Sequence, residues 1–257
     1  MQLTNVPDHY YLQLYSRDML GTILCLFLLA PNSRVDATVP IKRVAVVVMD
    51  GFETLDALGP HSVFQSVEIE DYKHINISDH SWLVNASGSI VSTAQVQVSL
   101  VGPSLSPVTS RQGVRVTPDA TITDQHEYDL VVIPAGVDTT ETQEFVKAVS
   151  THGGSIMSVC TGAVVPAKLG LLDGKQATSN SLFLGRFRRD FPSVHWVSLR
   201  GNLKQRFIES VPPLRVVTTA GVTAGIDGAL QFVSSWCGRS TAEATRELLE
   251  WPLPLES

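Results

Sequence analysis

The sequence predicts an α/β protein, a three-layer sandwich in which a mostly parallel sheet has helices on both faces. Residues 43–49, 129–134 and 155–159 are continuous apolar runs rich in β-branched side chains, as expected of strands that are buried on both faces. Residues 54–67 and 140–150 lie between such runs and have apolar side chains at helical spacing. Strands that alternate with helices of this length are typical of a parallel sheet with crossover helices.

The rest of the chain continues this alternation. Shorter strands are predicted at residues 96–101, 113–117, 177–178 and 214–219, and helices at 161–171, 181–191, 223–237 and 240–251. Ligands of open α/β sheets bind beyond the carboxyl ends of the strands. The residues that directly follow the strands are therefore the first candidates for a functional site.

Composition limits the class of protein. The 257 residues suit one large domain, and 44% hydrophobic against 17% charged residues indicate a sizeable core. A formal net charge of −6 and the lack of any Lys/Arg run argue against a nucleic-acid partner. No Cys/His spacing predicts a metal site, and we expect no cofactor and a small-molecule substrate.

Residues 1–40 differ from the domain expected at 41–257. Residues 19–30 are an apolar run that is too short for a stable membrane span, which needs about 20 residues, but suits the core of a signal peptide. Small residues near Ala37 fit a signal-peptidase site, whereas the leader before the run is long and carries Asp8 and Asp18. We expect a secreted protein; the alternatives are translation from Met19, or an extra apolar helix on a cytoplasmic protein.

Residues 68–92 are polar and irregular, and they form an expected insertion in the domain. Two N-glycosylation tripeptides lie in it, at Asn76 and Asn85. Together with the apolar run they favour the secretory interpretation.

Cys160 is the strongest candidate for chemistry. The segment SVCTGA at 158–163 places a cysteine between a strand and a helix, with Gly162 allowing a tight turn, as in a nucleophile elbow. A sulfur at a helix N-terminus can have a lowered pKa. Cys237 lies in an apolar helical stretch and is interpreted as a core residue.

Two aspartates accompany this cysteine as candidates. Asp56 lies at the start of the first helix, where a carboxylate is favoured by the helix dipole without any catalytic role. Asp227 lies among apolar residues of a later helix and is interpreted as a structural cap or an indirect partner of the site, because a buried acid needs a partner.

Four segments carry a resemblance to a known family. FETLDALGP at 52–60, SVCTGA at 158–163, AKLGLLDGKQATSN at 167–180 and AGVTAGIDGAL at 220–230 resemble the ThiJ/PfpI superfamily, the cysteine branch of the class I glutamine-amidotransferase-like, flavodoxin-like fold. The resemblance runs from about residue 41 to about residue 253. Within the superfamily the sequence is most similar to the isonitrile hydratases.

This resemblance implies Cys160 as nucleophile, Asp56 as its acid/base partner, and a pocket of backbone donors near Gly136 and Thr161. Ala135 stands where the family has a second glycine. Asn180 stands where many relatives have a histidine, so amidotransferase or protease chemistry is not expected.

The implied reaction is hydration of an isonitrile to an N-substituted formamide. A thiolate attacks the isonitrile carbon, and water resolves the resulting thioimidate. Asp56 is expected to hold a proton in the resting state, because a carboxylate beside a thiolate is disfavoured, and later to activate water.

Other functions remain open at this point. One alternative is a glyoxalase or deglycase acting on reactive aldehydes, and another is a non-catalytic ligand-sensing or redox-sensing domain. Because the sequence ends soon after its last predicted helix, we expect no helix-turn-helix module. Proteins of this kind commonly pair, and a homodimer is expected.

Overall fold

The structure, a computed structural model, describes residues 39–68, 94–124, 127–202 and 204–252. These belong to one compact unit, Val39–Ser257. The apolar run at 19–30, Asn76, Asn85 and most of the predicted insertion lie outside the described residues. None of the helices within these ranges is long and apolar enough to cross a membrane.

A seven-stranded sheet forms the middle layer, in the order β10-β11-β7-β6-β1-β2-β5. Every neighbouring pair is parallel except β10 and β11, which are antiparallel. The strands are β1 (Ile41–Val47), β2 (Gln95–Gly102), β5 (Ala120–Thr121), β6 (Leu130–Ile133), β7 (Ser155–Val159), β10 (Phe207–Ser210) and β11 (Val216–Thr219). Two small sheets join β3 (Val108–Thr109) with β4 (Arg115–Val116), and β8 (Gln176–Ala177) with β9 (His195–Trp196).

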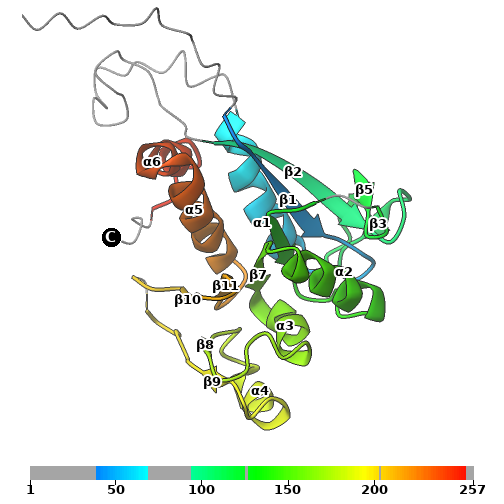
Figure 1. Cartoon of the computed structure of the whole chain (residues 1–257), viewed down its shortest axis with the longest axis vertical. Helices are drawn as coiled ribbons and strands as arrows, with labels where there is room; N and C mark the ends of the chain where they lie inside the picture. Colours follow the sequence, from blue (N-terminus) through cyan, green and yellow to red (C-terminus); the bar gives the residue numbers. More distant parts are fainter. Residues whose placement is uncertain (1–38, 69–93, 125–126, 203, 253–257) are drawn as a thin grey trace, which may run out of the picture. The chain divides into compact units, whose positions relative to one another are not determined.

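Helices cover both faces of the large sheet (Figure 1). α1 (Thr54–Gln65) links β1 to β2, and α2 (Thr140–Thr151) links β6 to β7 in the opposite direction along the sheet. Right-handed crossovers therefore place α1 and α2 on opposite faces. α5 (Ala224–Cys237) packs against α1, α6 (Arg239–Leu248) packs against α5, and α3 (Val164–Lys168) packs against α2. The predicted α/β three-layer fold is confirmed.

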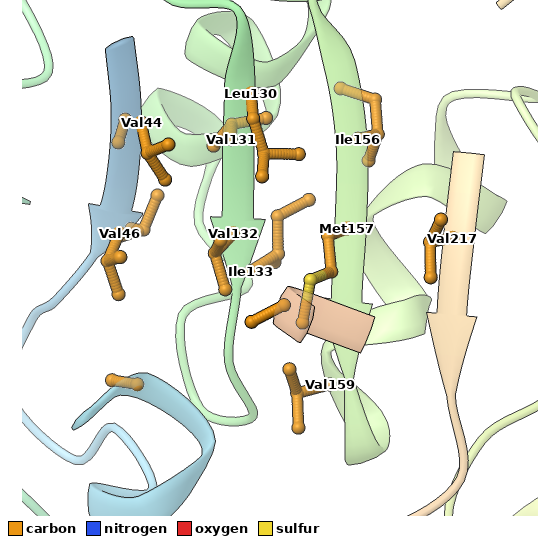
Figure 2. Packing of buried hydrophobic residues seen from close by; sticks show 14 of the residues in the cluster. Val44, Val46, Leu130, Val131, Val132, Ile133, Ile156, Met157, Val159 and Val217 are labelled. Carbon is orange, nitrogen blue, oxygen red and sulfur yellow. The ribbon is translucent and has the colours of Figure 1, made fainter. Parts of the chain in front are cut away.

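The central strands are apolar because both of their faces are covered. Val44 pairs with Leu130 between β1 and β6, and Val132 pairs with Met157 between β6 and β7. Figure 2 shows these side chains in the core beside Val217 of β11; all five are fully buried or nearly so. This parallel register brings the ends of β1, β6 and β7 to one edge of the sheet, where the predicted site residues follow.

The segment after β7 differs from the predicted helix at 161–171. A 3-10 turn, Cys160–Ala163, is followed by α3, which has only five residues. Gly170 has a φ of 70°, a left-handed conformation that ends helices. α4 (Leu184–Asp190) is likewise shorter than predicted. Strands β3, β5, β9 and β10 have two to four residues each and were not predicted.

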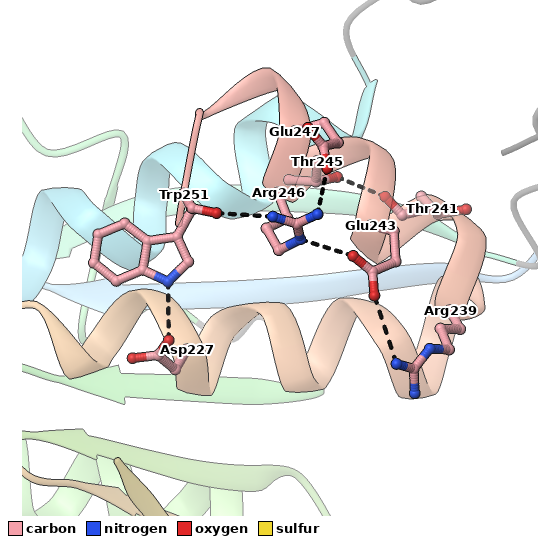
Figure 3. A network of polar contacts seen from close by, with 8 residues as sticks. All are labelled: Asp227, Arg239, Thr241, Glu243, Thr245, Arg246, Glu247 and Trp251. Carbon is pink, nitrogen blue, oxygen red and sulfur yellow. Dashed lines mark hydrogen bonds and ion pairs between the residues drawn. The ribbon is translucent and has the colours of Figure 1, made fainter. Parts of the chain in front are cut away.

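Asp227 belongs to a polar network that joins α5 to the end of α6 (Figure 3). Its Oδ1 accepts a hydrogen bond of 2.9 Å from Trp251 Nε1, and its Oδ2 lies 2.8 Å from Arg206 Nη1. Arg246 also holds this end of the chain, because its Nη1 donates to the Trp251 carbonyl at 3.0 Å and its Nε to Glu243 at 2.7 Å. The interpretation of Asp227 as a structural residue agrees with these contacts.

Replacing Trp251 with Phe should destabilise the fold without altering the cysteine. The substitution keeps a ring for Arg206, which lies 5.6 Å from the indole, but removes the donor to Asp227. A hydrogen bond to a charged group contributes about 1.5–3 kcal/mol, so the free energy of unfolding in urea should fall by that amount. The rate of Cys160 alkylation should stay the same; a changed rate would instead connect Asp227 to the site.

Candidate active site

The backbone at Cys160 makes a strained turn at the end of β7. Cys160 has a φ of 55°, which is uncommon for a residue with a side chain. A Cβ at Gly162 would lie 2.1 Å from the Ile133 carbonyl oxygen, so only glycine fits where the turn passes the end of β6. Ser179 Oγ donates to the Cys160 carbonyl at 2.7 Å and holds the turn from the other side.

The Cys160 sulfur is enclosed. The residue is 6% exposed, although a nucleophile elbow predicts a more open side chain. Asn180 Nδ2 donates to Sγ at 3.4 Å, and the Thr161 backbone N–H also donates to the sulfur. Both donors stabilise a thiolate.

Asp56 lies in the first turn of α1 and is completely buried. Its Oδ2 accepts a hydrogen bond of 3.0 Å from the Ala135 N–H. Its Oδ1 has no hydrogen-bond partner within the part of the chain that the structure describes. The helix is capped by Glu53, whose Oε2 accepts from the Asp56 N–H at 2.8 Å. One carboxyl oxygen is thus fixed and the other makes no hydrogen bond of ordinary geometry, although the Glu53 side chain interacts with this carboxyl group and raises its pKa.

Burial controls the protonation of both groups. It is the main cause that raises the pKa of Asp56 to about 8, with a further rise from Glu53 and opposing effects of the Ala135 N–H and the Arg111 charge. Burial and then the Asp56 charge raise the pKa of Cys160 to about 11, against the effects of Asn180 and Thr161. At neutral pH both groups therefore hold their protons.

The expected lowering of the Cys160 pKa is thus wrong. The predicted long helix is a 3-10 turn followed by a five-residue helix, and such a short element has few aligned peptide dipoles. Desolvation of the thiolate outweighs its two hydrogen bonds.

A cavity of about 430 Å³ adjoins this pair. Gly136 and Thr161 line it, so the backbone next to Cys160 faces a space large enough for a small molecule. Gly136 has a φ of 90°, and a Cβ there would lie 2.4 Å from the Gly51 carbonyl oxygen. Val164 and the rings of Phe183, Phe187 and Phe191 form an apolar wall.

The predicted site residues divide into two groups. Asp56, Ala135, Gly136, Thr161 and Asn180 surround Cys160 or the adjoining cavity. The Ala135 N–H is already bound to Asp56, so Ala135 positions the acid instead of offering its donor to a ligand.

Asp227 contacts Arg206 and Trp251, and Cys237 is buried in α5. Among the described residues no three His, Cys, Asp or Glu side chains gather as a metal site requires.

Sequence reasoning missed Arg111 and the capping role of Glu53. Arg111 lies in a loop between β3 and β4, far in sequence from the motifs. Only the tertiary fold brings it to the cavity.

Substitutions of Asp56 and Asn180 should shift the pH dependence of Cys160 alkylation in opposite directions. Asp56→Asn removes a charge that raises the thiol pKa, so the rate of iodoacetamide labelling should rise at lower pH than in the wild type. Asn180→Ala removes a donor to the sulfur, so its profile should move to higher pH. Labelling over a pH range that extends above about 11, the raised pKa of Cys160, with peptide mass mapping measures both shifts.

In all three proteins Cys160 should be labelled before Cys237, which is fully buried in α5. Shifts in the same direction, or faster labelling of Cys237, would contradict the geometry described for the pair.

Comparison with known proteins places the chain in a wider family. The sequence profile of the DJ-1/PfpI family matches residues 42–235. An isonitrile hydratase of Pseudomonas putida is 30% identical over 172 residues, which cover 64% of this chain and 71% of that protein. The HTH-type transcriptional regulator CdhR of Pseudomonas aeruginosa is 27% identical over 146 residues, which cover 55% of this chain and 41% of the regulator.

Solved structures share the fold. A ThiJ/PfpI family protein of Pseudomonas syringae superposes with a TM-score of 0.63 at 23% identity, covering 91% of this chain and 85% of that one. DJ-1beta of Drosophila melanogaster superposes with a TM-score of 0.62 at 16% identity, covering 81% and 97%.

The predicted secretion is wrong in the light of these comparisons. Nothing in the matching family or in the isonitrile hydratase relative indicates secretion. The expected glycosylation of Asn76 and Asn85 depended on that route and loses its support.

Proposed function

The chain belongs to the DJ-1/PfpI family, as its motifs predicted, and from this premise we propose that it hydrates an isonitrile to an N-substituted formamide. The observation that carries the proposal is the buried pair of Cys160 with Asp56, whose Oδ2 is fixed by Ala135 and whose Oδ1 is unoccupied. The similarity to an isonitrile hydratase supports the choice of reaction.

The reactive form of the pair holds one proton. Because the pKa of Cys160 is the higher of the two, this proton rests on the sulfur and must move to Asp56, which leaves Cys160 as the thiolate. In the first step Asp56 gives its proton to the isonitrile carbon, and the sulfur forms a bond to the same carbon. The product is a thioimidate with a C=N bond, and Asp56 is left as a carboxylate. The donors on the sulfur, Asn180 and the Thr161 N–H, favour the thiolate that this step needs.

Water completes the reaction. The Asp56 carboxylate takes a proton from water as its oxygen adds to the thioimidate carbon, and the former C=N electrons move to nitrogen. The hydroxyl proton then passes to that nitrogen, and the C–S bond breaks. The formamide leaves, and the thiolate and the protonated Asp56 are restored.

An acid with a pKa near neutrality suits this double task. Asp56 must donate a proton in one step and accept one in the next, and such a group works best when its pKa lies near the working pH. Burial, the main cause of the raised pKa of Asp56, supplies that property without a histidine.

A second candidate is a ligand-sensing domain. It is favoured by the matches to transcriptional regulators of Pseudomonas aeruginosa, of which CdhR is one and GbdR, at 28% identity over 147 residues, is another. Aldehyde chemistry of the glyoxalase or deglycase kind would use the same pair. Redox sensing is less favoured, because it needs an exposed thiol of low pKa and burial raises the pKa of Cys160.

The purified protein should convert cyclohexyl isocyanide to N-cyclohexylformamide, detected by mass spectrometry, and should leave methylglyoxal unchanged. Because general acid–base catalysis contributes about 10²–10⁴-fold, Asp56→Asn should lose that factor in kcat/KM, and Cys160→Ser should be inactive. Activity should rise as the pH approaches 8, since the pair must lose one of its two protons first.

Cys237→Ala is the matched control and should keep wild-type activity, because that thiol is buried in α5. Conversion of methylglyoxal alone would favour the aldehyde reaction. Binding of an isonitrile without turnover would favour the sensing domain.

We also infer that two copies of the chain pair. Leu182 is 79% exposed and the adjacent Phe183 is 45% exposed. Two adjacent exposed apolar side chains favour association with another protein surface. Light scattering at micromolar concentration should give twice the mass of one chain, and a monomer mass would refute the dimer.

A further inference from the structure

We propose that Arg111 binds a negatively charged group of the substrate at the mouth of the cavity beside Cys160. The favoured ligand is a small molecule with an apolar body and a carboxylate. The inference that this ligand is an isonitrile rests on the proposed function. The preference for a negative charge depends only on the residues that line the cavity. The placement of Arg111, the charges around it and the apolar side chains of the same cavity carry the inference.

The loop that bears Arg111 is fixed to the site. The Arg111 N–H donates to the Phe52 carbonyl at 2.8 Å, just before α1. Ser110 closes the turn, since its N–H donates to the Val114 carbonyl at 2.8 Å and its Oγ accepts from the Val114 N–H at 3.0 Å. The Arg111 side chain extends from this anchored backbone, is exposed, and lines the cavity.

The other cations of the cavity are neutralised by carboxylates of the same cavity. Lys168 Nζ lies 2.6 Å from Asp138, and Arg186 Nε lies 3.0 Å from Asp190; all four residues line the space. Arg111 forms no ion pair with any residue in the described ranges. The cavity therefore carries one uncompensated positive charge, and it is a guanidinium, which suits a carboxylate.

The nearby acids do not cancel this charge. The Arg111 charge lowers the pKa of Asp56, but burial raises this pKa more, so the Asp56 carboxyl stays protonated at neutral pH. The Glu53 carboxylate accepts from two neutral donors, the Asp56 N–H at 2.8 Å and Gln112 Nε2 at 2.9 Å, and within the described ranges it forms no ion pair with Arg111. An anion in the cavity would meet the free guanidinium.

Apolar side chains that line the same cavity define the rest of the ligand. Phe187 stacks on Trp196 with 5.0 Å between ring centroids and lies 6.1 Å from Phe191. These rings, with Phe183 and Val164, offer an apolar surface. A ligand with a charged end and an apolar body would contact both Arg111 and these rings.

Thiol alkylation tests the charge preference without any assumed substrate. Iodoacetate and iodoacetamide both alkylate Cys160 by forming an S–C bond as iodide leaves, and they differ in charge. The ratio of the iodoacetate rate to the iodoacetamide rate should fall about two- to fivefold in Arg111→Gln, the range of an exposed ion pair. Arg111→Lys should restore part of this ratio. Arg115→Gln, in β4 outside the lining of the cavity, is the control and should keep the wild-type ratio.

Substrate selection is tested with isocyanoacetate and its methyl ester. Wild-type protein should show a higher kcat/KM for the acid relative to the ester than Arg111→Gln does. If neither isonitrile is hydrated while the alkylation ratio still falls, the proposed reaction fails and the role of Arg111 stands. If the ester is hydrated and Arg111→Gln leaves both ratios unchanged, the role of Arg111 is refuted.

Discussion

The contact on which the site depends is the close approach of Gly162 to the end of β6. A Cβ there would collide with the Ile133 carbonyl oxygen at 2.1 Å and the Pro134 carbonyl oxygen at 2.8 Å. The chain can leave β7 in this direction only when residue 162 is a glycine. Cys160 adopts its positive φ in the same turn. The strain, which costs on the order of 1–3 kcal/mol, is opposed by the buried parallel strands on either side.

The end of β6 also positions the Asp56 carboxyl group. Ala135 follows β6 directly and gives its N–H to Asp56, while its carbonyl accepts from the Glu53 N–H at 2.9 Å. One short segment after β6 thus fixes the start of α1 and limits the residue at 162. The thiol and the carboxyl come from parts of the chain about a hundred residues apart, and the parallel register brings them together.

The sequence was most informative where burial dictates composition. The apolar runs at β1, β6 and β7 identified the middle of the sheet, and SVCTGA identified the elbow, because the turn requires a glycine at position 162, two residues after the cysteine. Short edge strands such as β10 were missed because a strand of four residues is too short to show a clear alternating pattern. The sign of the Cys160 pKa shift was missed because local sequence shows a helix start but not the burial that outweighs it. Arg111 reached the cavity through tertiary folding alone.

The raised pKa values of Cys160 and Asp56 determine the charge beside the cavity. A resting thiol and a resting carboxylic acid carry no charge, so the pair does not attract Arg111, and the guanidinium stays available to a ligand. Binding of an anion would in turn weaken the effect of Arg111, which lowers the pKa of Asp56. An anionic ligand would therefore help Asp56 keep its proton until the isonitrile carbon takes it. The residue that selects the ligand and the residue that protonates it are thus coupled through charge.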